Sequence, residues 1–220
     1  MQTLNWRGAR LPARESLDGE TVRLEPLDPS RHGDELFAAT AGADATWDYL
    51  AYGPFSRREE FIRWLAARAP LEDPFTYAIV DREAGSARGL TSLMRIDAAN
   101  GVIEVGHIWL SPALQRTRQA TEALYLQARY VFDELGYRRF EWKCDALNEP
   151  SRRAAERFGF VFEGIFRQHM VIKGRNRDTA WFSMLDGEWP ARKAEFEAWL
   201  SPDNFDAQRR QKTSLSSLRE

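Results

Sequence analysis

Apolar and polar residues alternate along several short stretches of the chain, and this period of two predicts strands. Short polar connections with Gly85 and Asn100-Gly101 separate the central stretches, which favours antiparallel neighbours in a meander. The strands predicted in this half of the chain are Thr21–Leu27, Phe75–Val80, Arg88–Arg95 and Val102–Leu110.

The period changes to that of a helix at Gln119. Apolar residues then recur three or four positions apart up to Leu135, and Gly136 supplies a C-terminal stop. Alternation returns over Phe140–Cys144, which predicts a strand. Asn148 and Pro150 have the composition of a helix start, and this helix is expected to end at Gly159. Two last strands, 161–172 and 178–185, flank a turn over 174–177.

The remaining segments complete the order of elements. Two helices are expected after the first strand, and Ser56-Arg57-Arg58-Glu59 has capping-box spacing at the start of the second. Residues 1–19 predict an extended lead-in, 190–200 a closing helix, and the last twenty residues a polar tail. This order predicts a mixed α/β (α+β) fold, with a mostly antiparallel sheet of about seven strands flanked by helices. We expect a single domain over 20–188 and a C-terminal helix and tail over 189–220.

Composition narrows the class of protein. Hydrophobic residues make up 43% of the 220 residues, and eight Trp argue against a disordered chain. The 31 basic and 33 acidic residues nearly cancel, which gives no general attraction to nucleic acid or anionic lipid. The one cysteine excludes an intramolecular disulfide, and we find no signal peptide and no apolar run of roughly 20 residues. We expect a cytoplasmic protein that binds neither nucleic acid nor membrane.

The most informative segment is Val102–Pro112 followed by Gln115–Glu122, where a strand leads through a short loop into a helix. Orphan N–H groups and the helix dipole favour an anion at such a helix start, and Arg116 and Arg118 add positive charge. From spacing alone two interpretations remain open, an anion site and an ordinary connection with two solvated arginines.

This segment resembles the central motif of the GNAT (Gcn5-related N-acetyltransferase) superfamily, whose loop is Gln/Arg-x-x-Gly-x-Gly/Ala. Here the loop is Gln115-x-x-Arg118-x-Ala120. The superfamily's second motif is matched by Asn148-x-x-Ser151, a helix and Gly159-Phe160. Residues 162–167 and Asp178 resemble the subgroup that acetylates the N-termini of ribosomal proteins and related small amines. The resemblance covers about residues 20–188.

The resemblance implies an acetyl-CoA-dependent N-acetyltransferase with the CoA pyrophosphate on this loop and the pantetheine arm on a splayed strand. It implies cofactor contacts by Ile108, Trp109, Leu110, Gln115, Arg116, Thr117, Arg118, Gln119, Ala120, Thr121, Asn148, Ser151 and Arg153. Arg118 departs from the glycine of the motif. Its side chain either turns away from the cofactor, contacts a phosphate, or marks a loss of binding.

Amine acetylation also needs proton transfer. Histone-acetylating members use a glutamate with the spacing of Glu104, eleven residues before Gln115, as general base. The resemblance therefore makes Glu104 the candidate base, and a sheet glutamate paired with a nearby arginine is the alternative. The tyrosine that many members place after Asn148 is missing, so Ser151 or solvent is left to protonate the departing thiolate.

Other titratable residues have structural interpretations. Side-chain alternation places His107 on the opposite face from Glu104, as a packed sheet residue. We expect His32 at the surface of the first helix and Cys144 as a buried, inert thiol. No Asp, Glu, Cys or His cluster has metal-ligand spacing, so no metal is expected.

The superfamily builds its acceptor site from the loop between the first two helices and the last hairpin. Here these segments offer Trp47, Asp48, Tyr49, Tyr52, Arg167, His169, Arg175 and Arg177. Aromatic rings suit a cationic amine and arginines suit a carboxylate, while a packing lid is a third interpretation.

The expected function is acetyl transfer to a primary amine of a small molecule, a peptide or a protein N-terminus in a direct ternary complex. The alternative is a GNAT-fold module that binds acyl-CoA as a sensor without turnover. The closing helix, with Phe196 and Trp199, either caps the domain or joins two copies in a homodimer.

Overall fold

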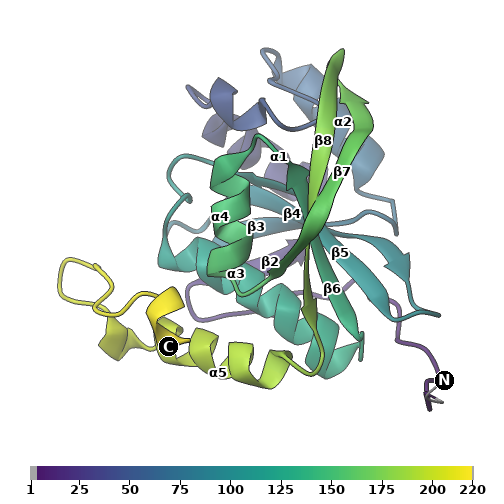
Figure 1. Ribbon diagram of the computed structural model, residues 1–220. Helices are drawn as coiled ribbons and strands as arrows, with labels where there is room; N and C mark the ends of the chain where they lie inside the picture. The colour runs from purple at the N-terminus through teal and green to yellow at the C-terminus, as the bar shows by residue number, and fades with distance from the viewer. Residues whose placement is uncertain (1–3, 220) are drawn as a thin grey trace.

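Within residues 4–219, eight strands form one sheet in the order β1-β2-β3-β4-β5-β6-β8-β7, in which β5 and β6 are parallel and the other neighbours antiparallel (Figure 1). The computed structural model describes residues 4–219. The strands are β1 (Leu17–Asp18), β2 (Val22–Pro26), β3 (Phe75–Asp81), β4 (Ser86–Asp97), β5 (Val102–Leu110), β6 (Arg139–Asp145), β7 (Val161–Ile172) and β8 (Arg175–Leu185). The predicted mixed fold and central meander are confirmed, and the lead-in supplies the additional strand β1. Residues 1–3 of that lead-in lie outside the described part of the chain.

In the described part of the chain, five helices flank this sheet. They are α1 (Pro29–Ala39), α2 (Arg58–Arg68), α3 (Arg118–Arg129), α4 (Glu149–Arg157) and α5 (Trp189–Leu200), with short helical turns η1 (Asp44–Trp47), η2 (Tyr130–Glu134), η3 (Pro202–Asn204) and η4 (Ser216–Leu218). Gly136, with φ of +74°, follows η2 as the predicted stop.

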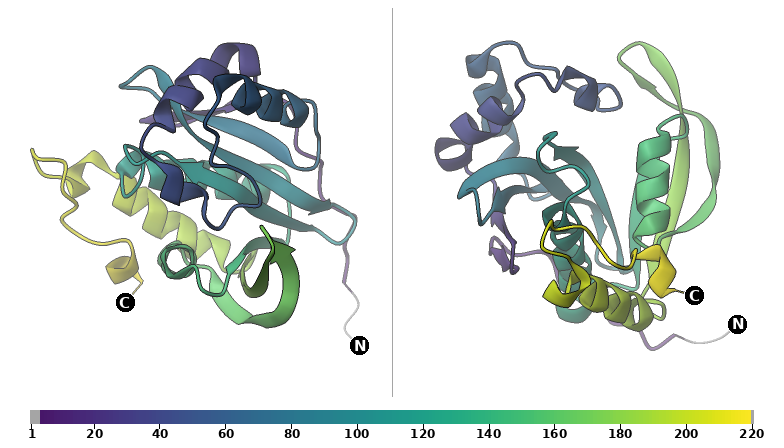
Figure 2. Two further views of the ribbon diagram at one scale, coloured as in Figure 1. Left: turned by 90° about the horizontal axis from the view of Figure 1, so that it is seen from above. Right: turned by 90° about the vertical axis from the view of Figure 1, so that its left-hand side faces the viewer.

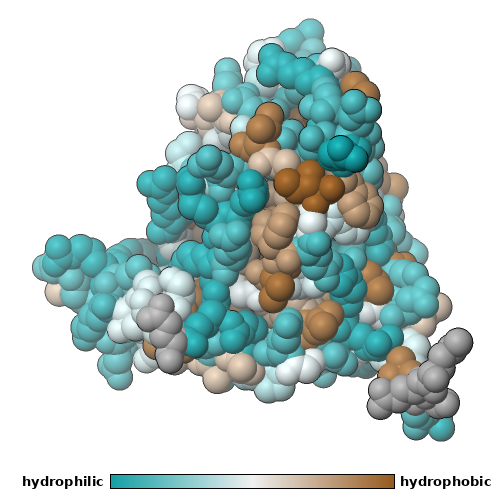
Figure 3. All heavy atoms as spheres, in the orientation of Figure 1, coloured by the Kyte–Doolittle hydropathy of each residue, from teal (hydrophilic) through white to brown (hydrophobic). Residues whose placement is uncertain are grey.

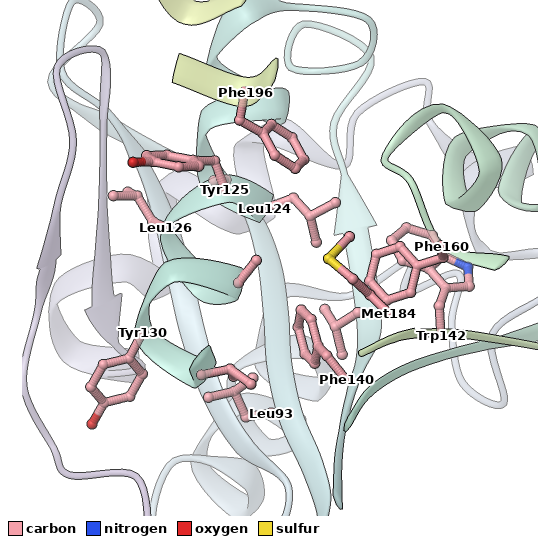
Figure 4. Packing of buried hydrophobic residues seen from close by; sticks show 14 of the residues in the cluster. Leu93, Leu124, Tyr125, Leu126, Tyr130, Phe140, Trp142, Phe160, Met184 and Phe196 are labelled. Carbon is pink, nitrogen blue, oxygen red and sulfur yellow. The ribbon is translucent and has the colours of Figure 1, made fainter. Parts of the chain in front are cut away.

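Side-chain alternation divides the core into two clusters, one on each face of the sheet. Along β3, Tyr77 and Ile79 join the cluster under α3 and α5, while Ala78 joins the one under α1 and α2. Figure 4 shows Leu124 and Met184 among the side chains packed between α3 and the sheet. Burying a side chain of this size stabilises the fold by roughly 1.5–3 kcal/mol.

The observed start of α4 agrees with the one predicted from the sequence, whereas the observed start of α2 does not. The Asn148 side chain accepts a hydrogen bond from the Ser151 N–H at 3.1 Å, which confirms the predicted cap. The capping box at Ser56 is wrong, because Arg57 is the N-cap of α2 and its side chain makes no capping bond. Glu59 therefore lies in the first turn, where its charge favours the helix dipole.

Two further predictions are corrected. His32 is not at the surface: it is 1% exposed, and its Nε2 lies 3.0 Å from the carboxylate of Glu25, which gives the imidazole a buried partner. The last hairpin turns earlier than predicted, at Lys173 and Gly174, whose φ angles are +49° and +74°. Two successive positive φ angles match the twist of a tight hairpin, so β8 starts at Arg175.

The C-terminal residues pack on the domain and do not form a solvated polar tail up to residue 219. Leu215 is 0% exposed and belongs to the core cluster under α5. A β-bridge joins Phe205 to Gln211, and η3 and η4 lie on either side of it. A single buried leucine in a polar stretch gives no sequence period, which is why the pattern missed this packing.

Strand β7 forms the edge of the sheet and leaves large apolar side chains in solvent. Phe162 and Ile165 are 43% and 44% exposed. Hydrophobic residues gather on this face between α4 and the β7–β8 hairpin (Figure 3). The far end of the hairpin, and not this apolar base, reaches the cavity described next.

Candidate functional site

Strands β5 and β6 separate partway along their length. Their parallel pairing runs from Val102 opposite Arg139 to Val105 opposite Trp142, and there it ends. Beyond this point β5 is paired with β4 only, through Gly106, Trp109 and Leu110. This geometry agrees with the predicted splay, and it leaves backbone N–H and C=O groups of β5 facing an open space.

A cavity of about 1840 Å³ occupies this space. Its walls come from β4, β5, β6, the loop before α3, α4, the β7–β8 hairpin and the C-terminal residues. The loop around η1 and the β7–β8 hairpin face each other in Figure 2 (right), and residues of both segments line the cavity. Lys173 at the hairpin turn joins them, because its Nζ donates to the carbonyl of Trp47 at 2.9 Å.

The loop before α3 and the first turn of this helix present unpaired backbone donors to the cavity. Thr117 is the N-cap, and its hydroxyl accepts the N–H of Ala120 at 3.1 Å. Among residues 4–219, the backbone N–H groups of residues 116–119 have no acceptor. Arg116 adopts φ of +59°, which turns the chain sharply into the helix. These donors lie at the positive end of the α3 dipole, a favourable place for a phosphate.

The side chain of Arg118 turns away from these donors. Its guanidinium donates to the carbonyl of Leu200, pairs with Glu20 at 2.6 Å, and lies 5.3 Å from the ring centre of Phe205. Of the three outcomes expected for this departure from the motif, the geometry agrees with a side chain directed away from the loop backbone. Arg118 therefore leaves access to the loop N–H groups open.

Helix α4 brings its Asn148-x-x-Ser151 face to the cavity. The Ser151 hydroxyl accepts the indole N–H of Trp142 at 3.0 Å, which leaves its own proton available. Arg153 does not line the cavity. It is exposed and paired with Glu149 at 2.8 Å, whereas Arg157, one turn further, does line it.

Glu104 lies at the centre of a buried ionic network. Its carboxylate is 2.7 Å from the guanidinium of Arg95 and 2.8 Å from Nζ of Lys143, and the residue is 3% exposed. Lys143 also bonds Glu141 at 2.7 Å and lies over the ring of Trp181. The partner arginine that the sequence offered as an alternative is present. Glu104 nevertheless lines the cavity, within reach of a bound molecule.

His107 lies in the same cavity as Glu104, so the prediction of opposite faces is wrong. A β-bulge is the reason: between Gly106 opposite Ser92 and Trp109 opposite Leu90, two residues of β5 face one of β4. His107 takes φ of +50° there. Its Nδ1 lies 2.9 Å from the hydroxyl of Tyr52. Burial, with smaller effects of Arg68 and Arg95, lowers the pKa of His107 to about 4, so the ring is neutral at pH 7.

The predicted acceptor residues separate into two groups. Tyr49 lines the cavity and its hydroxyl donates to the carbonyl of Leu147 at 3.2 Å, while Tyr52 reaches the cavity through His107. Trp47 is fully buried and stacks on Trp109 with ring centres 4.9 Å apart, a packing role for both indoles. The exposed residues Arg167 and His169 do not line the cavity.

Several cavity residues were not predicted from the sequence. They are Met94, Arg95, Lys143 and Met170. These four come from three strands, β4, β6 and β7, with no local motif, so only their common side of the split sheet could have identified them. Arg177, which the sequence offered for the acceptor side, also lines the cavity, and desolvation lowers the pKa of its guanidinium.

Cys144 is 5% exposed and burial raises the pKa of its thiol, as expected for an inert cysteine. No group of three His, Cys, Asp or Glu within residues 4–219 is arranged to hold a metal ion. Across the same residues, the helices are too short or too polar to span a membrane.

Comparison with known proteins places this geometry in context. The model of the acetyltransferase (GNAT) domain matches residues 21–161. YdaF of Bacillus subtilis (strain 168), which carries the provisional name of a ribosomal N-acetyltransferase, is 31% identical over 178 residues, 79% of this chain and 94% of YdaF. A crystal structure of a GCN5-related N-acetyltransferase from Brucella melitensis is 53% identical with a TM-score of 0.96, over 98% of both chains. A GNAT-family protein from Chromobacterium violaceum is 47% identical with a TM-score of 0.81, over 86% of this chain and 96% of its own.

Proposed function

This chain belongs to the GNAT acetyltransferase family, and we propose that it transfers an acetyl group from acetyl-CoA to a primary amine in a direct ternary complex. The acceptor is a small molecule, a peptide or a protein N-terminus. Acetyl-CoA supplies the acetyl group as a thioester, whose C–S bond breaks with the electron pair leaving on sulfur while the amine nitrogen forms the amide bond.

The loop before α3 is the observation that carries this proposal. Four consecutive N–H groups, at residues 116–119, lack acceptors among residues 4–219 and lie at the positive end of α3. A pyrophosphate offers the oxygens and charge that these donors need. The unpaired edge of β5 over residues 106–110 then offers backbone groups to the amides of a pantetheine arm. A backbone N–H near Ile108 is our candidate for polarising the thioester carbonyl.

For the amine proton, we propose Glu104 as the acceptor. Its carboxylate lines the cavity, and as an anion it also attracts the incoming ammonium. The ion pairs with Arg95 and Lys143 fix the position of this carboxylate beside the cavity. His107 is the competing group, because it is neutral and its Nε2 has no partner among residues 4–219.

On the leaving-group side, we propose that the Ser151 hydroxyl protonates the thiolate. The hydrogen bond from the Trp142 indole fixes the Ser151 oxygen as an acceptor, so the hydroxyl proton is not used in this bond. Tyr49, which lines the cavity and whose hydroxyl donates to the carbonyl of Leu147, is our candidate for contact with the acceptor. Asn148 and Gln115 also line the cavity, and we assign both to contact with the cofactor.

Thermal shift with acetyl-CoA and CoA, followed by thiol release against a panel of amines, tests the proposed activity. We expect stabilisation by both ligands and turnover with at least one amine. No stabilisation by either ligand would refute the proposal. Stabilisation without turnover on a broad panel would favour a sensor that binds acyl-CoA.

Glu104→Gln tests the proton acceptor. We expect this variant to bind acetyl-CoA with an unchanged Kd and to lose kcat/KM most severely at low pH, where more of the amine is protonated. His107→Asn is the comparison, and it should keep the pH profile of the wild type. An unchanged pH profile in Glu104→Gln, with a loss in His107→Asn, would transfer the role to His107.

A further inference from the structure

The C-terminal segment 201–213 folds back on the end of the cavity. Asn204 holds the segment together, because its side chain donates to the carbonyl of Trp199 at 3.0 Å and accepts the N–H of Thr213 at 2.9 Å. Gln211 accepts the indole N–H of Trp199 at 2.9 Å. The Phe205 ring packs edge-on against Trp199, with centres 5.1 Å apart. The segment is therefore a built part of the fold.

Arg118 and Arg209 tie this segment to the cofactor side of the domain. Arg118, in the loop that carries the unpaired N–H groups, lies over the ring of Phe205. Arg209 forms a two-pronged pair with Glu83, at 2.7 and 2.8 Å, beyond β3. The matched family domain ends at residue 161, so this wall lies outside it.

The proposed placement of acetyl-CoA puts the thioester at the bulge of β5 and the pyrophosphate at residues 116–119. Arg157, Phe205 and Gln211 line the same cavity. Two of them adjoin α3, because Arg157 bonds Thr121 and Phe205 lies against Arg118. The part of CoA beyond its pyrophosphate is a 3′-phosphoadenosine, which needs an apolar surface and a cation.

Arg157, at the end of α4, is such a cation without a counter-charge. Its guanidinium donates to the Thr121 hydroxyl at 3.1 Å and lies 4.9 Å from the ring centre of Trp199. Among residues 4–219, no carboxylate lies within 4.0 Å of it. The neighbouring Arg219 has Glu195 at 2.9 Å as its own partner. Desolvation and the charge of Arg219 both lower the pKa of Arg157, so an anion at this place would relieve an unfavourable charge.

We infer that Arg157 and the segment 201–213 form the subsite for the phosphoadenosine end of CoA, with Arg157 binding the 3′-phosphate and Phe205 covering the adenine. This inference rests on the proposed use of acetyl-CoA. The pyrophosphate takes the loop N–H groups, whereas Arg157 lies beside Thr121, one turn into α3. Arg118, in the place of the family glycine, acts as a positioning residue that holds Phe205 against the site.

Isothermal titration with CoA and 3′-dephospho-CoA tests the role of Arg157. A charge-assisted bidentate contact corresponds to a preference for CoA of about tenfold or more in the wild type. In Arg157→Gln this preference should fall to about twofold or less, mainly through weaker CoA binding. Arg129→Gln is the matched control, because Arg129 also ends a helix and lies over an aromatic ring, that of Tyr125, yet does not line the cavity.

Three outcomes would overturn the inference. The first is that the wild type binds CoA and 3′-dephospho-CoA equally well. The second is that Arg157→Gln keeps the preference for CoA. The third is that Arg153→Gln loses this preference while Arg157→Gln does not. Arg157→Lys keeps the charge and should keep part of the preference, which separates ligand binding from a loss of folding. If the wild type binds neither ligand, the proposed function fails; if it binds both without preference, only the subsite fails.

Phe205→Ser tests the segment itself. Loss of stacking on a base should weaken binding of CoA and of 3′-dephospho-CoA alike, by about tenfold. Binding of S-acetyl-4′-phosphopantetheine, which has no adenosine, should be unchanged. Equal weakening of all three ligands would assign Phe205 a purely structural role and refute this part of the inference.

Discussion

Replacement of His107 by Asn should make the folded protein less sensitive to acid. Burial lowers the pKa of His107 from 6.5 to about 4, and the charges of Arg68 and Arg95 act in the same direction. In the unfolded chain this pKa returns to about 6.5. The folded-state pKa is the lower one, so the stability linked to the neutral ring is present above pH 6.5 and is lost as pH falls toward 4.

The size of the effect follows from the difference between these pKa values. The difference between a pKa of 6.5 in the unfolded chain and about 4 in the folded protein corresponds to about 3 kcal/mol of stability, all of which is lost below pH 4, where His107 is protonated in both states. At pH 5 the unfolded state is already protonated and the folded state is not, which gives about 2 kcal/mol of lost stability relative to neutral pH. Asn removes the titrating group and tolerates the φ of +50° at this position.

Urea denaturation followed by tryptophan fluorescence at pH 7.5, 6 and 5 measures this difference. Between pH 7.5 and 5, the wild type should lose about 2 kcal/mol more of its free energy of unfolding than His107→Asn. His169→Asn is the control, because His169 lies exposed on β7 and outside the cavity. The reasoning fails if wild type and His107→Asn lose the same free energy over this interval, whatever their stabilities at pH 7.5.

Two further substitutions test parts of the site. Thr117→Ala removes the side-chain cap of α3 and should cost about 1 kcal/mol in urea denaturation, together with weaker binding of acetyl-CoA in titration; unchanged values of both would contradict the role of this helix start. Leu215→Ala should cost about 2–5 kcal/mol because the side chain is fully buried. Leu147→Ala, at a position that is 77% exposed, should change stability by less than about 0.5 kcal/mol. Equal effects of the two leucine substitutions would show that the C-terminal residues do not pack as described.

Local patterns predicted most of the elements because each depends on neighbouring residues. The helical period predicted α3 and its continuation η2, and Gly136 predicted where the helical segment ends. Asn148 predicted the start of α4, because its side chain accepts the N–H of Ser151, three residues further along the chain. The prediction of a capping box at Ser56 was wrong because of the backbone conformation of the next residue. Arg57 adopts the extended conformation, so the helix begins one residue later than the spacing suggests.

The candidate site was predictable where it is continuous in sequence. The loop 115–120 and the Asn148-x-x-Ser151 face both line the cavity, as their motifs implied. The choice between Arg153 and Arg157 was not predictable, because both lie on α4 and only the packing of the helix decides which one turns inward. Arg153 meets Glu149 in solvent, and Arg157 meets Thr121 and Trp199.

The sequence by itself determined the order of the elements, the loop that begins α3 and the family, since periodicity and short motifs are properties of neighbouring residues. Tertiary structure decided which groups share the cavity. A bulge turned His107 to the side of Glu104, and β4 and β6 supplied Arg95 and Lys143 to that carboxylate. Folding also brought Phe205 to Arg118, eighty-seven positions away (205 − 118). Such contacts between distant residues are set by the packing of strands and helices, which no local pattern encodes.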